Sequence, residues 1–425
     1  MSTCPQPAEI PQLSGAAVAW ADTPVLLDQS FIADPYAVYE LLRDARPVTR
    51  AQVPPAPPFW LVTRHEDVRA ALTNPRLAKD AAGLAELIAR RAGDGYEGTS
   101  LGQALHDHML NSDPPRHTRL RKMVSRAFTG PTIARLRPRM ESLAAELAGA
   151  VAARLAERQT VDLIEEFAFP LPMTVICEIL GVPDEQRAEF SAWSHTLLSA
   201  GPFEQYLAAA ASMGAYLSRL VADKQAHPGE DILSAIVAAA EDADRLSDAE
   251  ATSMASLLLV AGHETTMNLI GNGMLALMCD PAQLARLRAD LSMLPSAVEE
   301  FLRLDSPVNL ATTRFTTVPV TIAGTVIPEG EIVLLALGSA NRDPAAYERP
   351  DELDVGSGAG SGLAFGHGIH YCLGSQLARL EGEIAFRALL ELLPPLTLAG
   401  EPNDLVWHNS ILLRGLTRLP VRLAG

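Results

Sequence analysis

The chain has 425 residues, of which 48% are hydrophobic, 20% are charged and 5% are aromatic. This composition is apolar enough for a large buried core and excludes a mainly disordered chain. With 34 Lys and Arg residues against 51 Asp and Glu residues, the formal net charge is −17, which disfavours binding to nucleic acid or to an anionic membrane surface. The four cysteines lie far apart, at positions 4, 177, 279 and 372, so we expect neither a zinc cluster nor a secreted disulfide framework.

The sequence shows no targeting or membrane-spanning pattern. Residues 1–15 contain neither the basic nor the apolar segment of a signal peptide, and apolar runs such as Ile332–Leu337 are far shorter than the ~20 residues of a membrane-spanning helix. No repeat and no long linker divides the chain. We therefore expect a cytoplasmic protein with no membrane anchor, folded as a single domain over residues 1–425 with a loosely ordered extension at residues 1–30. We further expect a monomer.

The periodicity of apolar residues predicts a mainly α-helical fold with a small β region. A Pro-rich stretch before the β-like run Phe59–Thr63 indicates a hairpin. Helical spacing covers residues 118–157 and resumes from Ala188 into the 270s. A second β-rich patch follows at Arg314–Leu337, and a further helix is predicted at Leu373–Leu393.

The longest predicted helix has clear start and stop signals. Ser247 and Glu250 have the spacing of a capping box, in which their side chains satisfy the first free backbone N–H groups. The apolar pattern continues to about Cys279, where Pro281 ends it. Midway, residues 261–266 read Ala-Gly-His-Glu-Thr-Thr, which weakens a buried helix and introduces polar groups that need partners. Such an interruption favours a functional role.

The strongest functional pattern surrounds one cysteine. Residues 365–374 read Phe-Gly-His-Gly-Ile-His-Tyr-Cys-Leu-Gly, directly before a predicted helix. A cysteine at a helix N-terminus is favoured as the thiolate, and the glycines allow close approach of the backbone to whatever the sulfur holds. A lone thiolate suits a nucleophile or a single axial metal ligand. An isolated cysteine in a glycine turn is more often a buried structural residue, but the complete ten-residue string favours a ligand.

This string resembles the haem-binding signature of the cytochrome P450 family, the haem-thiolate monooxygenases, and matches it at Phe365, Gly368, His370, Cys372 and Gly374. Three further segments occur in that family's order. Residues 300–303 resemble its Glu-x-x-Arg helix, residues 261–266 its oxygen-activation segment, and residues 113–121 a helix start of its soluble bacterial members.

The resemblance covers Phe31 to Leu419 and implies the cytochrome P450 fold, with haem b between the long central helix and the helix after the cysteine loop. It implies that Cys372 is the thiolate ligand of the iron, a type of ligation that favours O–O cleavage. It also implies a set of residues that contact the cofactor. They are His117, Arg121, Arg314, His370, Phe365, Gly366, Ala261 and Gly374.

The predicted propionate site has a physical argument of its own. His117 and Arg121 are four residues apart and share a helix face, where two cations repel unless an anion lies between them. The resemblance identifies that anion as a haem propionate. The alternative is an ordinary solvated face. Arg119, Lys122 and Arg126 lie on another face of the same helix and form either a docking stripe for an acidic electron donor or ordinary solvated cations.

The resemblance assigns catalysis to Thr265 and Glu264, an alcohol–acid pair that delivers protons during oxygen activation. The competing interpretation is that Thr265 bonds back to the carbonyl four residues earlier while Glu264 forms a salt bridge. Both can hold at once. Small Ala261 would leave room for dioxygen and substrate.

Glu300 and Arg303 are three residues apart and are predicted to form a structural ion pair. Here the sequence departs from the family pattern, which supplies a further arginine shortly before the cysteine loop. Residues 353–357 contain none, and either Arg342 or Arg349 could substitute.

The predicted substrate pocket is mostly apolar, although apolar side chains in a helical protein are more often core. Its members are Leu84, Leu110, Leu257, Val260, Ala261, Leu310, Thr312 and Ile411, within the wider stretches 84–110 and 197–203.

We therefore expect an oxidoreductase that uses O2 to hydroxylate or epoxidise a lipophilic small molecule, in bacterial natural-product biosynthesis. The sequence has no flavin or iron–sulfur motif, so electrons from NAD(P)H would arrive through ferredoxin reductase and ferredoxin. The alternatives are a peroxide-driven haem-thiolate oxygenase and a haem protein that binds ligands without turnover; Glu264 and Thr265 argue against both.

Overall fold

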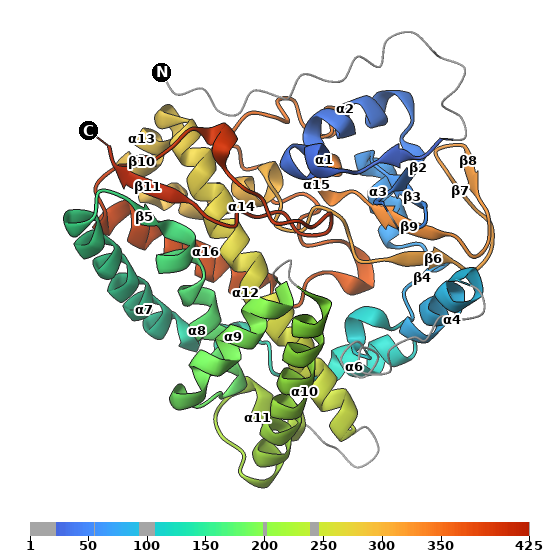
Figure 1. Ribbon diagram of the computed structural model, residues 1–425, viewed down its shortest axis with the longest axis horizontal. Helices are drawn as coiled ribbons and strands as arrows, with labels where there is room; N and C mark the ends of the chain where they lie inside the picture. The colour runs from blue at the N-terminus through green and yellow to red at the C-terminus, as the bar shows by residue number, and fades with distance from the viewer. Residues whose placement is uncertain (1–22, 55, 93–106, 199–201, 239–245, 425) are drawn as a thin grey trace.

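The computed structural model describes residues 23–54, 56–92, 107–198, 202–238 and 246–424 (Figure 1). The α-helices of these residues are α1 (Gln29–Ala33), α2 (Pro35–Ala45), α3 (His65–Leu72), α4 (Ala81–Ala92), α6 (Arg116–Ser125), α7 (Gly130–Glu157), α8 (Pro170–Leu180), α9 (Arg187–Leu198), α10 (Phe203–Ala226), α11 (Ile232–Ala238), α12 (Asp248–Cys279), α13 (Pro281–Ala289), α14 (Leu294–Leu304), α15 (Leu337–Ala340) and α16 (Ser375–Leu392). The strands are β1 (Val25–Leu26), β2 (Val48–Gln52), β3 (Phe59–Val62), β4 (Leu77–Ala78), β5 (Val161–Asp162), β6 (Arg314–Thr316), β7 (Val320–Ile322), β8 (Thr325–Ile327), β9 (Ile332–Leu335), β10 (Leu396–Leu398) and β11 (Pro420–Leu423). The predicted mainly α fold with a small β region is confirmed.

The largest sheet lies on one side of the molecule, opposite the helices around α12 (Figure 1). Its strand order is β1-β2-β3-β9-β6-β4. The predicted hairpin is the antiparallel pair β2–β3, in which Arg50 lies opposite Trp60. The second β-rich patch supplies β6 and β9 to the same sheet and the separate hairpin β7–β8. Within the expected N-terminal extension, residues 1–22 lie outside the described part, and β1 pairs with β2.

Two faces of this sheet are covered by different apolar clusters. On one face, Val62 and Val333 pack with residues of α3 and of the β7–β8 hairpin. On the other face, Leu61 and Leu334 pack with Tyr39 of α2. The alternation of neighbouring residues between the two clusters is the period of two that a strand imposes.

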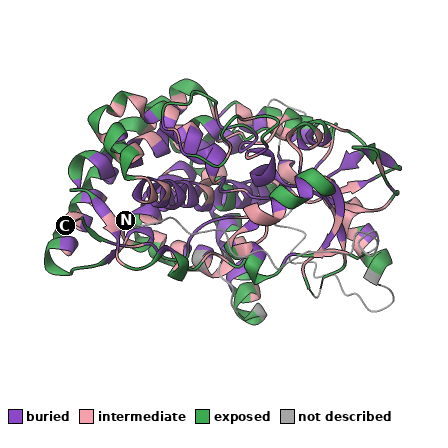
Figure 2. Cartoon of the chain, turned by 90° about the horizontal axis from the view of Figure 1, so that it is seen from above, coloured by how far each residue is buried: buried purple, intermediate pink, exposed green. Residues whose placement is uncertain are grey.

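The main hydrophobic core lies among helices α7, α8, α12, α14 and α16. Helix α12 is buried along most of its length, because α8, α10, α14 and α16 all pack against it. Figure 2 shows this buried interior through the middle of the molecule, with exposed residues on the outward faces of the surrounding helices. None of the described helices combines the length and the apolar character required to cross a membrane.

The boundaries of α12 agree with the predicted signals. The Ser247 side chain accepts a hydrogen bond from the Glu250 backbone N–H, and the Glu250 carboxylate accepts one from the Ser247 N–H. Asp280 is the C-cap residue before Pro281. The predicted weak segment, residues 261–266, stays helical, because the helices packed around α12 hold it there.

The helical pattern over 118–157 is two helices rather than one. Helix α6 ends at Ser125 and α7 begins at Gly130, and the Thr129 side chain caps α7 by accepting from the Thr132 N–H at 3.3 Å. Pro131 occupies the first turn of α7, where its missing N–H costs nothing. These short-range cap signals decide the break.

Candidate active site

The cysteine loop is folded back on itself just before α16. The Cys372 N–H donates to the Phe365 carbonyl at 2.9 Å, and the Gly366 N–H donates to the Leu363 carbonyl at 2.8 Å. Gly366 and Gly368 have φ angles of 72° and 76°, a region that L side chains rarely adopt. The glycines therefore allow the tight loop that places Cys372 three residues before the first residue of α16.

The Cys372 thiol is subject to opposing influences. Its side chain is accessible, yet protein atoms surround it closely enough that burial raises the pKa of the thiol. The Gly374 N–H and the cations Arg121 and Arg379 act in the opposite direction and favour the thiolate. The helix start that we expected to favour the thiolate is thus present, but within the chain alone burial outweighs it.

No group of three or more His, Cys, Asp or Glu side chains among the described residues could hold a metal ion. A metal at Cys372 would therefore need the rest of its coordination from a cofactor. This agrees with a single axial thiolate and argues against an all-protein metal site.

The predicted propionate residues come together from three elements. His117 and Arg121 lie on α6, His370 on the cysteine loop and Arg314 on β6. The rings of His117 and His370 have their centroids 4.4 Å apart. Arg121 Nη2 donates to the Tyr371 carbonyl at 2.6 Å, and Arg314 Nη1 donates to the Leu77 carbonyl at 3.3 Å.

Several nitrogen atoms of this group have no hydrogen-bond partner among the described residues. They are both ring nitrogens of His117, Nε2 of His370 and Nε of Arg314, all of which are buried. Burial lowers the pKa of His117, and burial with the nearby cations lowers that of His370 to about 2. Buried polar groups are normally satisfied, so this set fits an anion carried by a ligand, such as the carboxylates of haem.

The middle of α12 is accessible where the pattern predicted space. Val260 is 38% exposed and Ala261 is also exposed, although the residues before Val260 are buried. Gly262 lies against α8, where an added Cβ would approach Ile176 Cδ1 to 2.9 Å. Leu257 is buried in the main core, one turn before Val260.

The alcohol–acid pair has a mixed environment. Thr265 Oγ1 donates to the Ala261 carbonyl at 2.8 Å, as the competing interpretation proposed. Among the residues that the structure describes, Glu264 forms no salt bridge and its buried Oε2 atom has no partner. Burial raises the pKa of Glu264 to about 7. A carboxyl group of this kind can exchange a proton near neutral pH.

Sequence reasoning did not assign a role to His263, which lies between these residues and is completely buried. Its Nδ1 atom is 2.9 Å from the Leu259 carbonyl, and its Nε2 atom is 3.1 Å from Ser194 Oγ on α9. Burial lowers the pKa of His263 to about 4, so the ring is neutral and joins α12 to α9.

Glu300 and Arg303 form the predicted buried ion pair. Arg303 Nε and Nη2 donate to the two Glu300 oxygens at 2.8 Å each. The remaining hydrogen bonds of the guanidinium group go to main-chain carbonyls. Their acceptors are those of Asn341, Pro350 and Glu352.

The place of the expected third arginine is taken by other groups. Glu300 accepts hydrogen bonds from the Asp354 backbone N–H at 3.1 Å and from Ser357 Oγ at 3.2 Å. Arg342 instead pairs with Asp351 at 3.4 Å, and Arg349 pairs with Glu352 at 2.8 Å. Neither arginine therefore replaces the missing one; a backbone amide and a hydroxyl do.

The predicted substrate-pocket residues lie in several different regions of the structure. Leu110 and Leu257 belong to the main core, whereas Leu310, which is fully buried, and Ile411 belong to the cluster on the α2 side of the sheet. Val260 and Ala261 are accessible on α12, and Leu84 lies on α4. Thr312, just before β6, accepts a hydrogen bond from Lys79. The stretches 93–106 and 199–201 lie outside the described residues.

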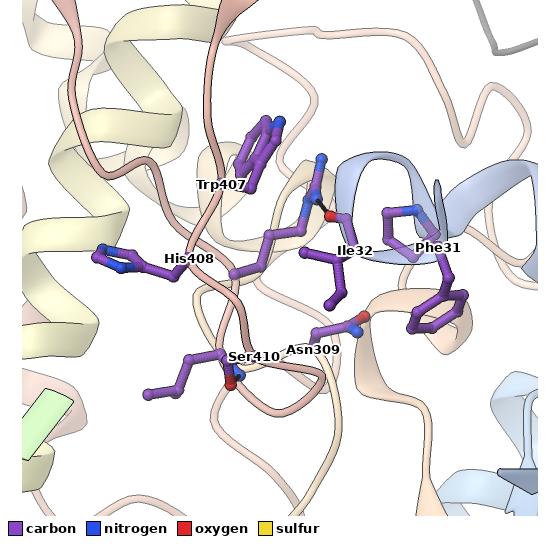
Figure 3. Close-up of a pocket in the computed structure, with 9 residues that line it drawn as sticks. Phe31, Ile32, Asn309, Trp407, His408 and Ser410 are labelled. Atoms are coloured by element: carbon purple, nitrogen blue, oxygen red, sulfur yellow. Dashed lines mark hydrogen bonds between the residues drawn. The ribbon is translucent and has the colours of Figure 1, made fainter. Parts of the chain in front are cut away.

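A small cavity lies elsewhere, between α1 and the segment that contains Trp407, His408 and Ser410 (Figure 3). Its volume is about 10 Å³, which is room for about one water molecule. None of the predicted pocket residues lines it, so it is not a candidate substrate site.

Two cationic features differ from the sequence expectations. Arg119, one of the three residues of the predicted docking stripe, is paired with Glu250 at the start of α12, while Lys122 and Arg126 are exposed. Lys79 is buried close to Thr312 and Arg314, and no sequence motif pointed to it. The antiparallel pairing of β4 with β6 places it there, and that pairing has no local sequence signal.

Comparisons with a family profile, with relatives and with solved structures agree with the resemblance of the motifs. The family profile described as Cytochrome P450 matches residues 217–404. Cytochrome P450 107B1 of Saccharopolyspora erythraea is 48% identical over 93% of this chain and 96% of its own length. The 6-deoxyerythronolide B hydroxylase of the same organism is 42% identical over 95% of this chain and 99% of its own.

Among solved structures, the tirandamycin C-bound P450 monooxygenase TamI superimposes with a TM-score of 0.85 at 46% identity. The match covers 94% of this chain and 100% of that one. The resemblance of the motifs thus extends to the whole fold.

Proposed function

The chain belongs to the cytochrome P450 family and is a P450 monooxygenase, and from this we propose that it hydroxylates or epoxidises a lipophilic small molecule of bacterial natural-product biosynthesis. O2 is the oxidant, and NAD(P)H supplies electrons through ferredoxin reductase and ferredoxin. One relative is named 6-deoxyerythronolide B hydroxylase, and one similar solved structure is that of the P450 monooxygenase TamI with bound tirandamycin C. Both names support a substrate of this chemical kind.

The observation that carries the proposal is the accessible Cys372 beside a group of buried nitrogen atoms that have no partner in the part of the chain that the structure describes. The family implies a haem-thiolate cofactor, which supplies the activation of O2 when it is bound. We assign Cys372 as the iron ligand of haem b and His117, Arg121, Arg314 and His370 as the residues that hold its carboxylates. Phe365, Gly366 and Gly374 shape the loop around the sulfur, and Ala261 on α12 would contact the cofactor.

Glu264 and Thr265 have the properties of a proton-delivery pair. The Thr265 hydroxyl donates a hydrogen bond to the Ala261 carbonyl. The lone pairs of its oxygen stay free to accept a hydrogen bond from a group that carries a proton. Glu264, with a pKa of about 7, can give and regain a proton at neutral pH. A binding protein without turnover has no need for such a pair, and a peroxide-driven oxygenase has less need for it.

The accessible surface of Val260 and Ala261 supports a substrate position beside α12. Leu257, Thr312 and the other predicted pocket residues would then differ in their distance from the substrate, because the structure distributes them over several clusters. An apolar wall with few polar groups suits a lipophilic molecule.

The proposal is tested by the absorption spectrum of purified protein that is reduced with dithionite and exposed to carbon monoxide. We expect the long-wavelength Soret band that is peculiar to thiolate ligation, and we expect Cys372→Ser to lose it. Cys279→Ser, at the end of α12, serves as the matched control and should keep the band.

Two outcomes would contradict the proposal. Folded protein that binds no haem would refute the cofactor and the activity together. A band typical of histidine ligation in native, freshly prepared protein would refute Cys372 as the ligand.

A further inference from the structure

Lys79 carries a buried charge that the proposed function does not use. It directly follows β4, and its side chain is only 3% exposed. Its ammonium group donates a hydrogen bond to Thr312 Oγ1, which is a neutral partner. A buried ammonium group is costly unless an anion compensates it, so the surroundings of Lys79 need to supply one.

The sheet register brings a second cation to the same place. In the β4–β6 ladder, Leu77 lies opposite Thr316 and Ala78 opposite Phe315, so Lys79 follows in register opposite Arg314. Arg314 is itself 4% exposed. Like charges directly opposite each other on two strands are destabilising, unless something of opposite charge lies between them.

The described residues supply only part of that opposite charge. Among them, Asp113 is the carboxylate that acts on both Lys79 and Arg314. Its Oδ2 atom already accepts hydrogen bonds from the backbone N–H groups of Lys79 and Asp80, at 2.8 and 3.0 Å. Burial and the charge of Arg314 lower the pKa of Lys79 to about 7, as expected of an ammonium group short of anions.

Lys79 also belongs to the same electrostatic group as the proposed carboxylate-binding residues. Lys79 lies close enough to His117 and His370 for its charge to act on both rings. Within this group Lys79 and Arg314 are both buried cations, and among the described residues Asp113 is the carboxylate that acts on both. A carboxylate carried by a ligand would supply the opposite charge that the two cations lack.

We propose that Lys79 is a further anchor of the cofactor, whose ammonium group binds one of the two haem carboxylates together with Arg314. Thr312 holds the ammonium group in position through its hydroxyl oxygen. This inference rests on the proposed function, because it takes haem as the ligand. It adds Lys79, which no motif identifies, to the predicted cofactor-contacting residues. It also implies that the Thr312 hydroxyl binds Lys79 and is not free to contact substrate.

The test compares Lys79→Met and Lys79→Gln holoprotein with the native protein. Haem loss is measured as transfer to excess apomyoglobin, and the midpoint potential of the ferric/ferrous couple is measured by spectroelectrochemistry. Since a hydrogen bond to a charged group contributes about 1.5–3 kcal/mol, we expect both variants to lose haem roughly tenfold faster or more. We also expect both variants to have a lower midpoint potential. Loss of a nearby positive charge stabilises the ferric form, because that form bears one more positive charge than the ferrous form. Lys79→Arg should lie close to the native protein.

Lys122→Met is the matched control, because this lysine is exposed on α6, and it should leave both measurements unchanged. Native haem loss and potential in Lys79→Met and Lys79→Gln would overturn the inference. A defect in Lys79→Met alone would also overturn it, since the glutamine keeps a hydrogen bond to Thr312 but not the charge. A change confined to the substrate-induced spin shift would assign Lys79 to the substrate instead. Failure of native protein to bind haem would refute the proposed function itself, which makes the two failures distinguishable.

Discussion

The hydroxyl groups of Thr265 and Thr266 are adjacent in sequence but lie in different surroundings. Both bond back to the carbonyl four residues earlier, at 2.8 and 3.2 Å. Thr265 is partly accessible beside exposed Ala261, whereas Thr266 is buried and faces Glu381 of α16. Only Thr265 is therefore placed to act on a bound molecule, and Thr266 acts within the helix packing.

We expect Thr265→Ala to uncouple electron use from product formation. The substitution removes a hydroxyl that can relay a proton, while α12 itself should be kept, because alanine favours the helix. Product formed per NAD(P)H consumed should fall several-fold, and hydrogen peroxide should rise correspondingly. Stoichiometry of the three quantities checks this, and Thr265→Ser should restore much of the coupling. Native coupling in Thr265→Ala would remove this residue from the mechanism.

At the scale of elements, the contact between α12 and α16 contains a carboxyl group that must carry a proton. Glu381 is 2% exposed, and burial raises its pKa to about 8. The single hydroxyl hydrogen of Thr266 is already used in its bond to the Gly262 carbonyl, so the Thr266 oxygen can only accept. A protonated Glu381 supplies the donor that this contact needs.

The proton on Glu381 makes stability depend on pH. Its pKa rises from 4.5 in the unfolded chain to about 8 in the folded protein, so the folded state binds more protons between these values. The contribution of Glu381 to the free energy of unfolding should therefore fall as pH rises from about 5 to 8, by an amount on the order of a few kcal/mol. Glu264 contributes with the same sign up to about pH 7.

Glu381→Gln should keep a donor for Thr266 and lack the titration, so we expect a smaller fall in the midpoint of thermal unfolding between pH 5 and 9. The slope that remains belongs to Glu264 and, with the opposite sign, to groups whose pKa values burial lowers, such as Lys79 and His263. Glu391→Gln, at the exposed end of the same helix, is the matched control. Equal slopes for Glu381→Gln and the native protein would show that Glu381 is ionised in the folded state.

The sequence predicted those elements whose signals are local. The Ser247–Glu250 capping box, Pro281 and the hairpin before Phe59 all mark their positions through residues a few places apart, and the structure confirms them. The break between α6 and α7 also has local signals, in Thr129 and Pro131, but the apolar periodicity on both sides obscures them.

The sequence predicted those residues of the candidate site that belong to recognisable motifs, among them Cys372, His117 and Arg121. Lys79 does not, because its role depends on a two-residue strand that pairs with residues more than 230 positions away. The contacts of Glu300 with a backbone amide were equally unpredictable, since any residue at position 354 can supply that amide.

At the scale of the whole molecule, the net charge of −17 repels an acidic electron donor, so docking of such a donor needs a local group of cations. Arg119 is neutralised by Glu250, and Arg116 by Asp107 and Glu250. Lys122 on α6 and Arg126, the C-cap residue of this helix, remain exposed, and the same helix carries His117 and Arg121. An acidic electron donor attracted to these two charges would thus approach the side of the protein that holds the proposed cofactor-binding residues.

Replacing both Lys122 and Arg126 by Glu should weaken association with an acidic ferredoxin. Rim charges act mainly on the association rate, so we expect the apparent KM for ferredoxin to rise at least about threefold at low salt. The difference from the native protein should shrink as ionic strength increases. Steady-state turnover at several salt concentrations checks this. Turnover that is insensitive to the double substitution would indicate that the donor binds elsewhere.

The Glu300–Arg303 pair has a consequence for how such proteins are recognised. Arg303 forms hydrogen bonds with residues 341, 350 and 352 only through their carbonyl oxygens. Glu300 forms one with residue 354 only through its backbone N–H group. Every residue type offers the carbonyl, and every residue except proline offers the amide. Substitutions at these positions would therefore leave a carbonyl or an amide available to the pair, whereas Ser357 contributes to it through its side chain. A motif search that requires the third arginine would miss this chain, although the fold around its cysteine loop is complete.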